Sequence, residues 1–214
     1  RGLGDVYKRQ VIKLIPTKND NFFVCMRLCS IQDNRFAYRK NVLPTSMHPS
    51  QAALIVSLAK PYLKETAQIM DPFCGVGTLL IERAHLVPAR EIYATDTYGD
   101  AITMGRENAA LAKTRINFIH RDFFDFRHDY KFDELITDMP VRNRQTKAEM
   151  ELFYERFFDK ASEHLVSGGI IVMYSNEIGF VKKQIRLRVE YRLLQETCIL
   201  DKKDFYLFVI RYED

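Results

Sequence analysis

The chain has 214 residues, of which 47% are hydrophobic, and its 32 Lys and Arg against 28 Asp and Glu give a net charge of +4. A globular protein of this length buries enough surface to fold without disulfides or structural metal ions. The short apolar runs exclude a membrane-spanning helix, which needs about 20 apolar residues. The four cysteines have no C-x-x-C spacing and no nearby histidine cluster, so we expect no metal site and a reducing, cytoplasmic location.

The N-terminal part of the chain differs in character from the rest. Residues 1–10 show no helical or strand period and none of the features of a signal peptide, so we expect a non-native leader there and a longer native protein. Residues 11–45 contain short apolar or alternating runs separated by polar turns, which predict a small β-rich appendage. Its three expected strands cover Val11–Ile15, Phe22–Ser30 and Phe36–Arg39.

A domain of the α/β class is predicted for residues 46–214, and it opens with a helix over Ser50–Leu63 that has Ser50 as its N-cap. From Gln68 onward, strand-length apolar runs alternate with helix-length amphipathic runs, which is typical of parallel strands joined by crossover helices. Only four residues separate the last two strands, so these must form an antiparallel hairpin. We therefore predict a Rossmann-like, mostly parallel seven-stranded sheet with a C-terminal antiparallel hairpin. The later helices are expected at 78–86, 98–112, 147–165 and 177–188.

A glycine-containing loop follows the first strand of this predicted sheet. It reads Asp71-Pro-Phe-Cys-Gly-Val-Gly-Thr78, so two glycines let the backbone approach a ligand just before a helix begins. A dinucleotide-binding loop would have a third glycine where Leu80 stands. S-adenosylmethionine carries an ammonium group that Asp71 could neutralise. The loop therefore favours S-adenosylmethionine over a dinucleotide.

Acidic residues follow the next two predicted strands as well. Asp96 comes 21 residues after Gly75, at the position from which a carboxylate accepts hydrogen bonds from ribose hydroxyls. Asp122 follows the third strand and could accept from the adenine amine, while Phe123 could border the ring. The predicted cofactor-binding residues are Asp71, Pro72, Phe73, Cys74, Gly75, Gly77, Thr78, Asp96, Thr97, Asp122 and Phe123.

Four segments of the chain together resemble the UPF0020 group of Rossmann-like RNA methyltransferases, in which the catalytic domain usually follows an RNA-binding THUMP domain. The segments are Asp71–Glu82, Ala94–Thr97, His120–Phe123 and Thr137–Pro140. The resemblance implies a class I fold, S-adenosylmethionine as cofactor, tRNA or rRNA as partner, and a THUMP-like domain missing from the N-terminal side.

The loop after the fourth strand departs from the pattern of that family. The family reads Asn or Asp, then two prolines, then an aromatic residue, and the resemblance implies that the first side chain accepts from the target's exocyclic amine while the aromatic stacks on a flipped base. Here the loop is Asp138-Met139-Pro140-Val141. Asp138, Met139 and Pro140 are the predicted catalytic residues, whereas Val141 cannot stack and leaves the target base open.

Basic residues are concentrated towards the N-terminus and near that loop. Residues 1–70 carry 11 Lys and Arg against 4 Asp and Glu. Arg142, Arg144 and Lys147 follow Asp138 closely, so we expect them to neutralise RNA phosphates.

Methylation of a pyrimidine carbon would need a cysteine nucleophile. Cys74 lies in the cofactor loop and Cys198 in a predicted strand, so we do not expect that chemistry.

Three functions are therefore consistent with the sequence. The first is an S-adenosylmethionine-dependent methyltransferase acting on an exocyclic amine of guanine or adenine in tRNA or rRNA. The second is a methyltransferase of a protein or small molecule, which Val141 and the modest net charge favour. The third is a partner subunit that binds S-adenosylmethionine without catalysis, because its Asp-Met-Pro-Val loop is degenerate.

Overall fold

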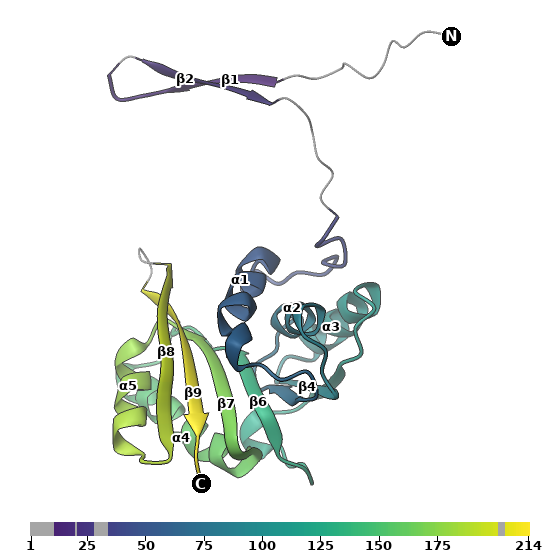
Figure 1. Cartoon of the computed structure of the whole chain (residues 1–214), viewed down its shortest axis with the longest axis vertical. Helices are drawn as coiled ribbons and strands as arrows, with labels where there is room; N and C mark the ends of the chain where they lie inside the picture. Colours follow the sequence, from purple (N-terminus) through teal and green to yellow (C-terminus); the bar gives the residue numbers. More distant parts are fainter. Residues whose placement is uncertain (1–10, 20, 28–33, 201–203) are drawn as a thin grey trace. The chain divides into compact units, whose positions relative to one another are not determined.

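The computed structural model describes residues 11–19, 21–27, 34–200 and 204–214 (Figure 1). Two compact units are present, residues 1–36 and residues 37–214. In the first, β1 (Val11–Pro16) and β2 (Phe22–Arg27) pair as an antiparallel hairpin. The expected leader at 1–10 and the expected end of the second strand at 28–30 lie outside the described residues.

The prediction of a third N-terminal strand at Phe36–Arg39 is wrong, because residues 35–38 form a turn. Tyr38 is buried, and its hydroxyl donates a hydrogen bond to the carboxylate of Glu82 in α2 (Thr78–Leu86). Burial of this aromatic ring against a helix thus overrides the weak local alternation that suggested a strand. The larger compact unit begins at Ala37.

The larger unit alternates strands and helices, as the periodicity predicted. Short 3₁₀ segments lie at Lys60–Tyr62 and at Phe123–Asp125. The remaining elements, in chain order, are α1 (Pro49–Ala59), β3 (Gln68–Asp71), α2, β4 (Glu91–Asp96), α3 (Gly99–Leu111), β5 (Asn117–His120), β6 (Phe132–Asp138), α4 (Lys147–His164), β7 (Leu165–Ser175), α5 (Ile178–Leu187), β8 (Tyr191–Leu200) and β9 (Phe205–Tyr212).

Within the described residues of this unit, seven strands form one sheet in the order β5-β4-β3-β6-β7-β9-β8. The first five are parallel, whereas β9 runs antiparallel to both β7 and β8. The predicted α/β fold with a C-terminal antiparallel hairpin is therefore confirmed. The chain changes direction across the sheet between β3 and β6, and ligands of open α/β sheets bind at the carboxyl ends of the strands beside such a point.

Helices cover both faces of the sheet, with α1, α2 and α3 on one side and α4 and α5 on the other (Figure 1). The core beneath α4 is rich in aromatic rings, and Tyr154, Phe157 and Phe158 of that helix are fully buried. A capping box starts α4, since Glu149 N donates to Thr146 Oγ1 at 3.2 Å and Thr146 N donates to Glu149 Oε2 at 2.7 Å. The helix therefore begins at Lys147 for a local reason and is held by its aromatic face.

The start of α1 differs from the prediction. His48, rather than Ser50, is the N-cap, and its Nδ1 accepts a hydrogen bond from Ser50 N at 3.3 Å. Pro49 fits directly after it because the first turn of a helix needs no N–H group at that position. The cap shifts the helix start slightly and leaves residues 43–47 as an irregular segment before α1.

A buried ion pair joins α2 to β6. Arg83 Nε and Nη2 donate to the two carboxylate oxygens of Glu134, each at 2.9 Å, and both side chains are inaccessible to solvent. Arg83 also donates to the carbonyls of Val87 and Lys64, at 2.5 and 3.0 Å. Each of the three guanidinium nitrogens thereby donates at least one hydrogen bond, which compensates the burial of the charge. The pair fixes the position of α2 relative to β6, the strand that ends at Asp138.

Candidate active site

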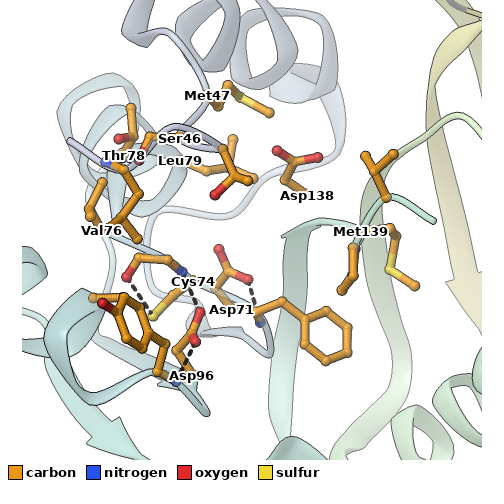
Figure 2. A pocket seen from close by; sticks show the side chains of 18 residues that line it. Ser46, Met47, Asp71, Cys74, Val76, Thr78, Leu79, Asp96, Asp138 and Met139 are labelled. Carbon is orange, nitrogen blue, oxygen red and sulfur yellow. Dashed lines mark hydrogen bonds between the residues drawn. The ribbon is translucent and has the colours of Figure 1, made fainter. Parts of the chain in front are cut away.

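A pocket of about 380 Å³ lies at the carboxyl ends of β3, β4 and β6. Three carboxylates face it, those of Asp71, Asp96 and Asp138, and each ends one of these strands. Figure 2 shows Asp71 and Asp138 pointing into the same space. The pocket is lined by Leu43, Thr45, Ser46, Met47, Asp71, Phe73, Cys74, Gly75, Val76, Thr78, Leu79, Asp96, Tyr98, Ala101, Asp138, Met139, Pro140 and Val141.

The two glycines of the loop between β3 and α2 are required for different reasons. Gly75 and Gly77 both have positive φ angles, +50° and +77°. A Cβ atom on Gly75 would have no protein atom within 4 Å, whereas one on Gly77 would lie 2.8 Å from Cζ of Phe118. Gly77 therefore allows close packing against β5, and Gly75 keeps a stretch of backbone at the pocket wall open to a ligand.

Asp71 is buried at the end of β3, and its Oδ1 accepts a hydrogen bond from Phe73 N at 3.0 Å. Burial raises the pKa of this carboxyl to about 8, and the charges of Asp138 and Asp96 add to the effect. A carboxyl held in this state gains most from a cationic ligand, because a positive charge nearby favours its ionised form.

Asp96 is held by two backbone amides. Gly75 N donates to Oδ2 and Tyr98 N donates to Oδ1, each at 2.8 Å. Cys74 N also donates to the carbonyl of Thr95 at 3.0 Å, which ties the glycine loop to the end of β4. Each oxygen of a carboxylate has a further lone pair, so Asp96 can still accept hydrogen bonds from a ligand.

Asp138 lies in a different setting at the end of β6. Burial raises the pKa of its carboxyl to about 7. Next to it, Met139 is buried and its N–H donates to the carbonyl of Tyr174 at 2.9 Å, whereas Val141 is 52% exposed. The strand thus fixes the backbone at Asp138 and Met139, and the loop then emerges to the surface.

The segment before α1 supplies one wall of the pocket. Its backbone is fastened to α3, because Lys40 N and Asn41 N donate to Asn108 Oδ1 at 3.2 and 3.0 Å, and Asn108 Nδ2 donates to the carbonyl of Asn41 at 2.9 Å. The four residues of the segment that reach the pocket are Leu43, Thr45, Ser46 and Met47.

Six of the eleven predicted cofactor residues line this pocket, but five do not. One of the five is Gly77, which packs against Phe118 instead. The carbonyl oxygen of Pro72 accepts a hydrogen bond from Thr95 Oγ1 at 3.0 Å. Thr97 is exposed beside the pocket. Asp122 caps the short 3₁₀ segment by accepting from Phe124 N at 2.9 Å. Phe123 is buried in the aromatic core, where its ring packs against Phe73 and Phe157.

The three predicted phosphate-binding residues lie outside the pocket on the surface. Arg142, Arg144 and Lys147 are all exposed. Arg142 Nε is 3.6 Å from a carboxylate oxygen of Glu177. All three follow the pocket-lining residue Val141 within six positions along the chain.

The sequence analysis missed several lining residues. Their positions could have predicted three of them. Tyr98 comes just after the acidic end of β4, and Leu79 and Ala101 lie in the first turns of α2 and α3, beside the same strand ends. The residues from the segment before α1 are less accessible to such reasoning, because their approach to the pocket depends on the long-range bonds to Asn108.

The charges around the pocket define the ligand that fits. Among the described lining residues there is no Lys, Arg or His to balance the three carboxylates. A dinucleotide would place its anionic phosphates against these acids, whereas S-adenosylmethionine carries a sulfonium and an ammonium group. Burial, followed by the charges of Asp71 and Asp96, raises the pKa of the Cys74 thiol, so this cysteine is a poor nucleophile.

Two further properties hold for the part of the chain that the structure describes. It contains no cluster of three or more His, Cys, Asp or Glu side chains arranged to hold a metal ion. None of its helices combines the length and apolarity that crossing a membrane requires.

Residues 37–197 match the family described as UPF0020, RMKL-like methyltransferase domain. A tRNA (guanine(10)-N2)-dimethyltransferase of Methanothermobacter thermautotrophicus is 32% identical over 187 residues, which are 82% of this chain and 54% of that protein. The chain therefore spans about half the length of this curated relative.

Two more distant similarities accompany this match. A release factor glutamine methyltransferase of Lactococcus lactis is 25% identical over 155 residues, covering 64% of this chain and 56% of that protein. The crystal structure of TrmN from Thermus thermophilus superimposes with a TM-score of 0.73 at 20% identity, covering 96% of this chain and 61% of that one. At this identity the likeness shows the fold.

Proposed function

The chain belongs to the UPF0020 family as an RMKL-like methyltransferase domain, and from this premise we propose that it methylates an exocyclic amine of guanine in RNA, with S-adenosylmethionine as the methyl donor. The observation that carries the proposal is the set of three carboxylates around a pocket whose described lining has no basic side chain. A cationic cofactor relieves the mutual repulsion of these carboxylates. Asp138, which we do not assign to the cofactor, can then accept hydrogen bonds from a target amine.

The cofactor half of the pocket is formed by Asp71, Asp96 and the glycine loop. We assign the cofactor's ammonium group to Asp71 and its ribose hydroxyls to Asp96. Gly75 allows the cofactor to lie against the backbone, because a side chain there would extend into open space. When bound, S-adenosylmethionine supplies an electrophilic methyl group on a positively charged sulfur.

Asp138 belongs to the other half of the pocket, which we assign to the target base. Its carboxylate would accept hydrogen bonds from the amine hydrogens and so direct the nitrogen lone pair towards the methyl group, which is chiefly a contribution of orientation. The amine nitrogen loses a proton once it has been alkylated, and Asp138 is placed to accept it. Met139 and Pro140 fix the backbone beside this carboxylate, and Met139 N donates to the carbonyl of Tyr174.

Support for RNA as the substrate comes from the relative named as a tRNA (guanine(10)-N2)-dimethyltransferase and from the cations near the pocket. We assign Arg142, Arg144 and Lys147 to phosphate contacts, because they are exposed between Asp138 and α4. The THUMP-like domain and the cytoplasmic location stay predictions.

Protein methylation is the second candidate. The relative named as a release factor glutamine methyltransferase and the non-aromatic Val141 both favour it. The two substrates pose a similar chemical task, since each presents an NH₂ group attached to a planar carbon, and Asp138 could orient either one.

Transfer of a labelled methyl group tests the proposal. The protein would be incubated with radiolabelled S-adenosylmethionine and either tRNA, rRNA or a protein extract, and labelled RNA would be digested for nucleoside mass spectrometry. We expect label in RNA as N2-methylated guanosine, formed about 100-fold more slowly or slower still by the Asp138→Ala variant. Label in protein alone would establish the second candidate. Binding of the cofactor without transfer to any substrate would indicate a catalytically inactive subunit.

A further inference from the structure

We infer that Thr137, which precedes Asp138 in β6, is a positioning residue that acts on Asp71. Its hydroxyl donates a hydrogen bond to the Asp71 side chain and so favours the carboxylate form that the cofactor's ammonium group needs. The inference rests on the proposed function, because it takes S-adenosylmethionine as the ligand and Asp71 as the partner of the ammonium. It gives a role to a residue that neither the sequence analysis nor the family match singles out.

The sheet places Thr137 beside the end of β3. The strands β3 and β6 are parallel neighbours, and Met70 of β3 is in register with Leu135 of β6. Asp71 is the last residue of β3, so it lies next to the end of β6, which is formed by Thr137 and Asp138. The two side chains thus come from neighbouring strands at the edge of the sheet where the pocket lies.

The hydroxyl of Thr137 is available for such a contact. The residue is inaccessible to solvent, and its Oγ1 is buried without a hydrogen-bond partner among the described residues. By contrast, the hydroxyl of Thr95 at the end of β4 donates to the carbonyl of Pro72 at 3.0 Å. A buried hydroxyl without a partner costs the folded protein free energy, and a bond to Asp71 would remove this cost.

Few groups around Asp71 favour its ionised form. Burial raises the pKa of this carboxyl most, and the charges of Asp138 and Asp96 raise it further. Two donors act in the opposite direction and lower the pKa. They are the backbone N–H of Phe73, which donates to Oδ1 at 3.0 Å, and the nearby hydroxyl of Thr137.

Other titratable groups cannot take over this task. The thiol of Cys74 has a raised pKa, chiefly through burial, and the described pocket lining contains no Lys, Arg or His. Hydrogen bonds to a carboxylate are shorter and about twice as strong as those between neutral groups. The contact with Thr137 therefore stabilises ionised Asp71 more than its protonated form, and the carboxylate keeps lone pairs for the ammonium group.

Titration of the protein without ligand tests the contact itself. The pKa of Asp71 would be read from the carboxyl resonance by ¹³C NMR in the wild type, Thr137→Val and Thr137→Ser. We expect about 8 in the wild type and a higher pKa in Thr137→Val, which has no hydroxyl. Thr137→Ser keeps the hydroxyl and should resemble the wild type. Thr103→Val, at an exposed position of α3, is the control and should leave the pKa unchanged.

Affinity for S-adenosylhomocysteine, measured by calorimetry between about pH 6 and pH 9, tests the consequence for the cofactor. At pH 7 we expect Thr137→Val to bind about tenfold more weakly than the wild type, which corresponds to one unit of pKa. The difference should shrink towards pH 9, because Asp71 then becomes ionised in both proteins. Ionisation of the ligand itself affects all variants equally.

A merely structural role for Thr137 makes different predictions. Loss of packing would lower the unfolding temperature and weaken binding by the same factor at every pH. In our account the unfolding temperature of Thr137→Val at pH 6 should not decrease, because Asp71 is then protonated in both proteins. Thr137→Ala also lacks the hydroxyl, serves as a second variant, and should shift the pKa of Asp71 in the same direction.

The outcomes separate this inference from the proposed function. An unchanged titration of Asp71 in both variants without the hydroxyl, or a loss of affinity that does not depend on pH, would overturn the inference and leave the proposed function standing. A wild-type protein that does not bind S-adenosylhomocysteine would overturn the proposed function and this inference with it.

Discussion

The two halves of the pocket are built in different ways. On the side of Asp71 and Asp96, backbone amides of the glycine loop and of Tyr98 hold the carboxylates in place. On the side of Asp138, the carboxylate makes no hydrogen bond within the described residues, and the loop reaches solvent at Pro140 and Val141. The first half is complete before a ligand arrives, whereas the second has an acceptor still to be partnered.

This difference matches the two kinds of ligand that we assign to the pocket, a cofactor that all enzymes of the fold share and a target that varies between them. A cofactor of constant structure suits a rigid half whose carboxylates are already oriented. A target that varies between enzymes of one fold suits a short loop whose residues can change without disturbing the sheet. The variants below are chosen so that each half can be altered without the other.

Asp138→Ala should have the largest effect. We expect turnover to fall by about 100-fold or more, because the group that orients the amine is lost, while the affinity for S-adenosylhomocysteine stays within about threefold. Single-turnover methylation and calorimetry measure the two quantities. A variant with undiminished turnover would remove Asp138 from the catalytic machinery.

Asp71→Asn should affect the other half. We expect the affinity for S-adenosylhomocysteine to fall by about tenfold or more, the scale of a hydrogen bond to a charged group, with a smaller effect on the single-turnover rate at saturating cofactor. Its unfolding temperature should not decrease, because the wild-type carboxyl is buried with a raised pKa. A loss of stability with unchanged affinity would reverse the assignment of this residue.

Activity should depend on pH through Asp138. With the pKa of this carboxyl raised to about 7 by burial, the active carboxylate form is gained as pH rises through 7, so turnover should increase about tenfold from pH 6 to a plateau above pH 8. Stability should show the opposite trend. The folded protein holds protons on Asp71 and Asp138 that the unfolded chain releases near pH 4, so the free energy of unfolding should decrease between about pH 4 and pH 8.

Rates and denaturation midpoints across this pH range check both trends. In Asp138→Asn the stability trend should be reduced, because one of the two raised pKa values has been removed. An activity profile that is flat through pH 7 in the wild type would contradict the role given to the carboxylate.

The two loop glycines should respond differently to the same substitution. Gly77→Ala places a Cβ 2.8 Å from Phe118 at a positive φ angle, so we expect a loss of about 2 kcal/mol or more in the free energy of unfolding. Gly75→Ala meets open space and should cost about 1 kcal/mol of stability, but its methyl group should weaken cofactor binding. Chemical denaturation and calorimetry separate the two effects, and identical behaviour of the two variants would contradict this division.

Val141→Tyr should produce the smallest effect. An aromatic ring at this half-exposed position offers a surface for base stacking, which is worth about 1–3 kcal/mol per base in single-stranded complexes. We expect KM for RNA to decrease about fivefold with little change in kcat. Val141→Ala, which changes the same residue without adding a ring, is the control. A higher KM for the tyrosine variant would show that the open space beside Asp138 is needed by the target.

Local patterns in the sequence were sufficient to predict much of the fold and the meeting of Asp71, Gly75 and Asp96 in one pocket. Alternating strand and helix periods gave the parallel sheet, and a four-residue connection required the hairpin of β8 and β9. Asp71, Gly75 and Asp96 were identifiable because strand ends in such sheets share one edge. These features depend on residues close together in the chain or on a general property of the topology.

Features that depend on long-range packing were not predictable in the same way. Phe123 looked like a ring beside the adenine because it follows a strand end, but its burial among the aromatic residues of α4 is decided by distant neighbours. The turn at Tyr38 and the contribution of Ser46 to the pocket likewise depend on contacts with α2 and α3. A single sequence contains no local signal for such contacts.

A crystal structure of the complex with S-adenosylhomocysteine would test the division of the pocket most directly. The account predicts the ligand's amino group at Asp71, its ribose hydroxyls at Asp96, and its sulfur facing a free Asp138 carboxylate. Asp138 bound to the ligand's amino acid end or ribose, or a ligand held outside this pocket, would contradict the account.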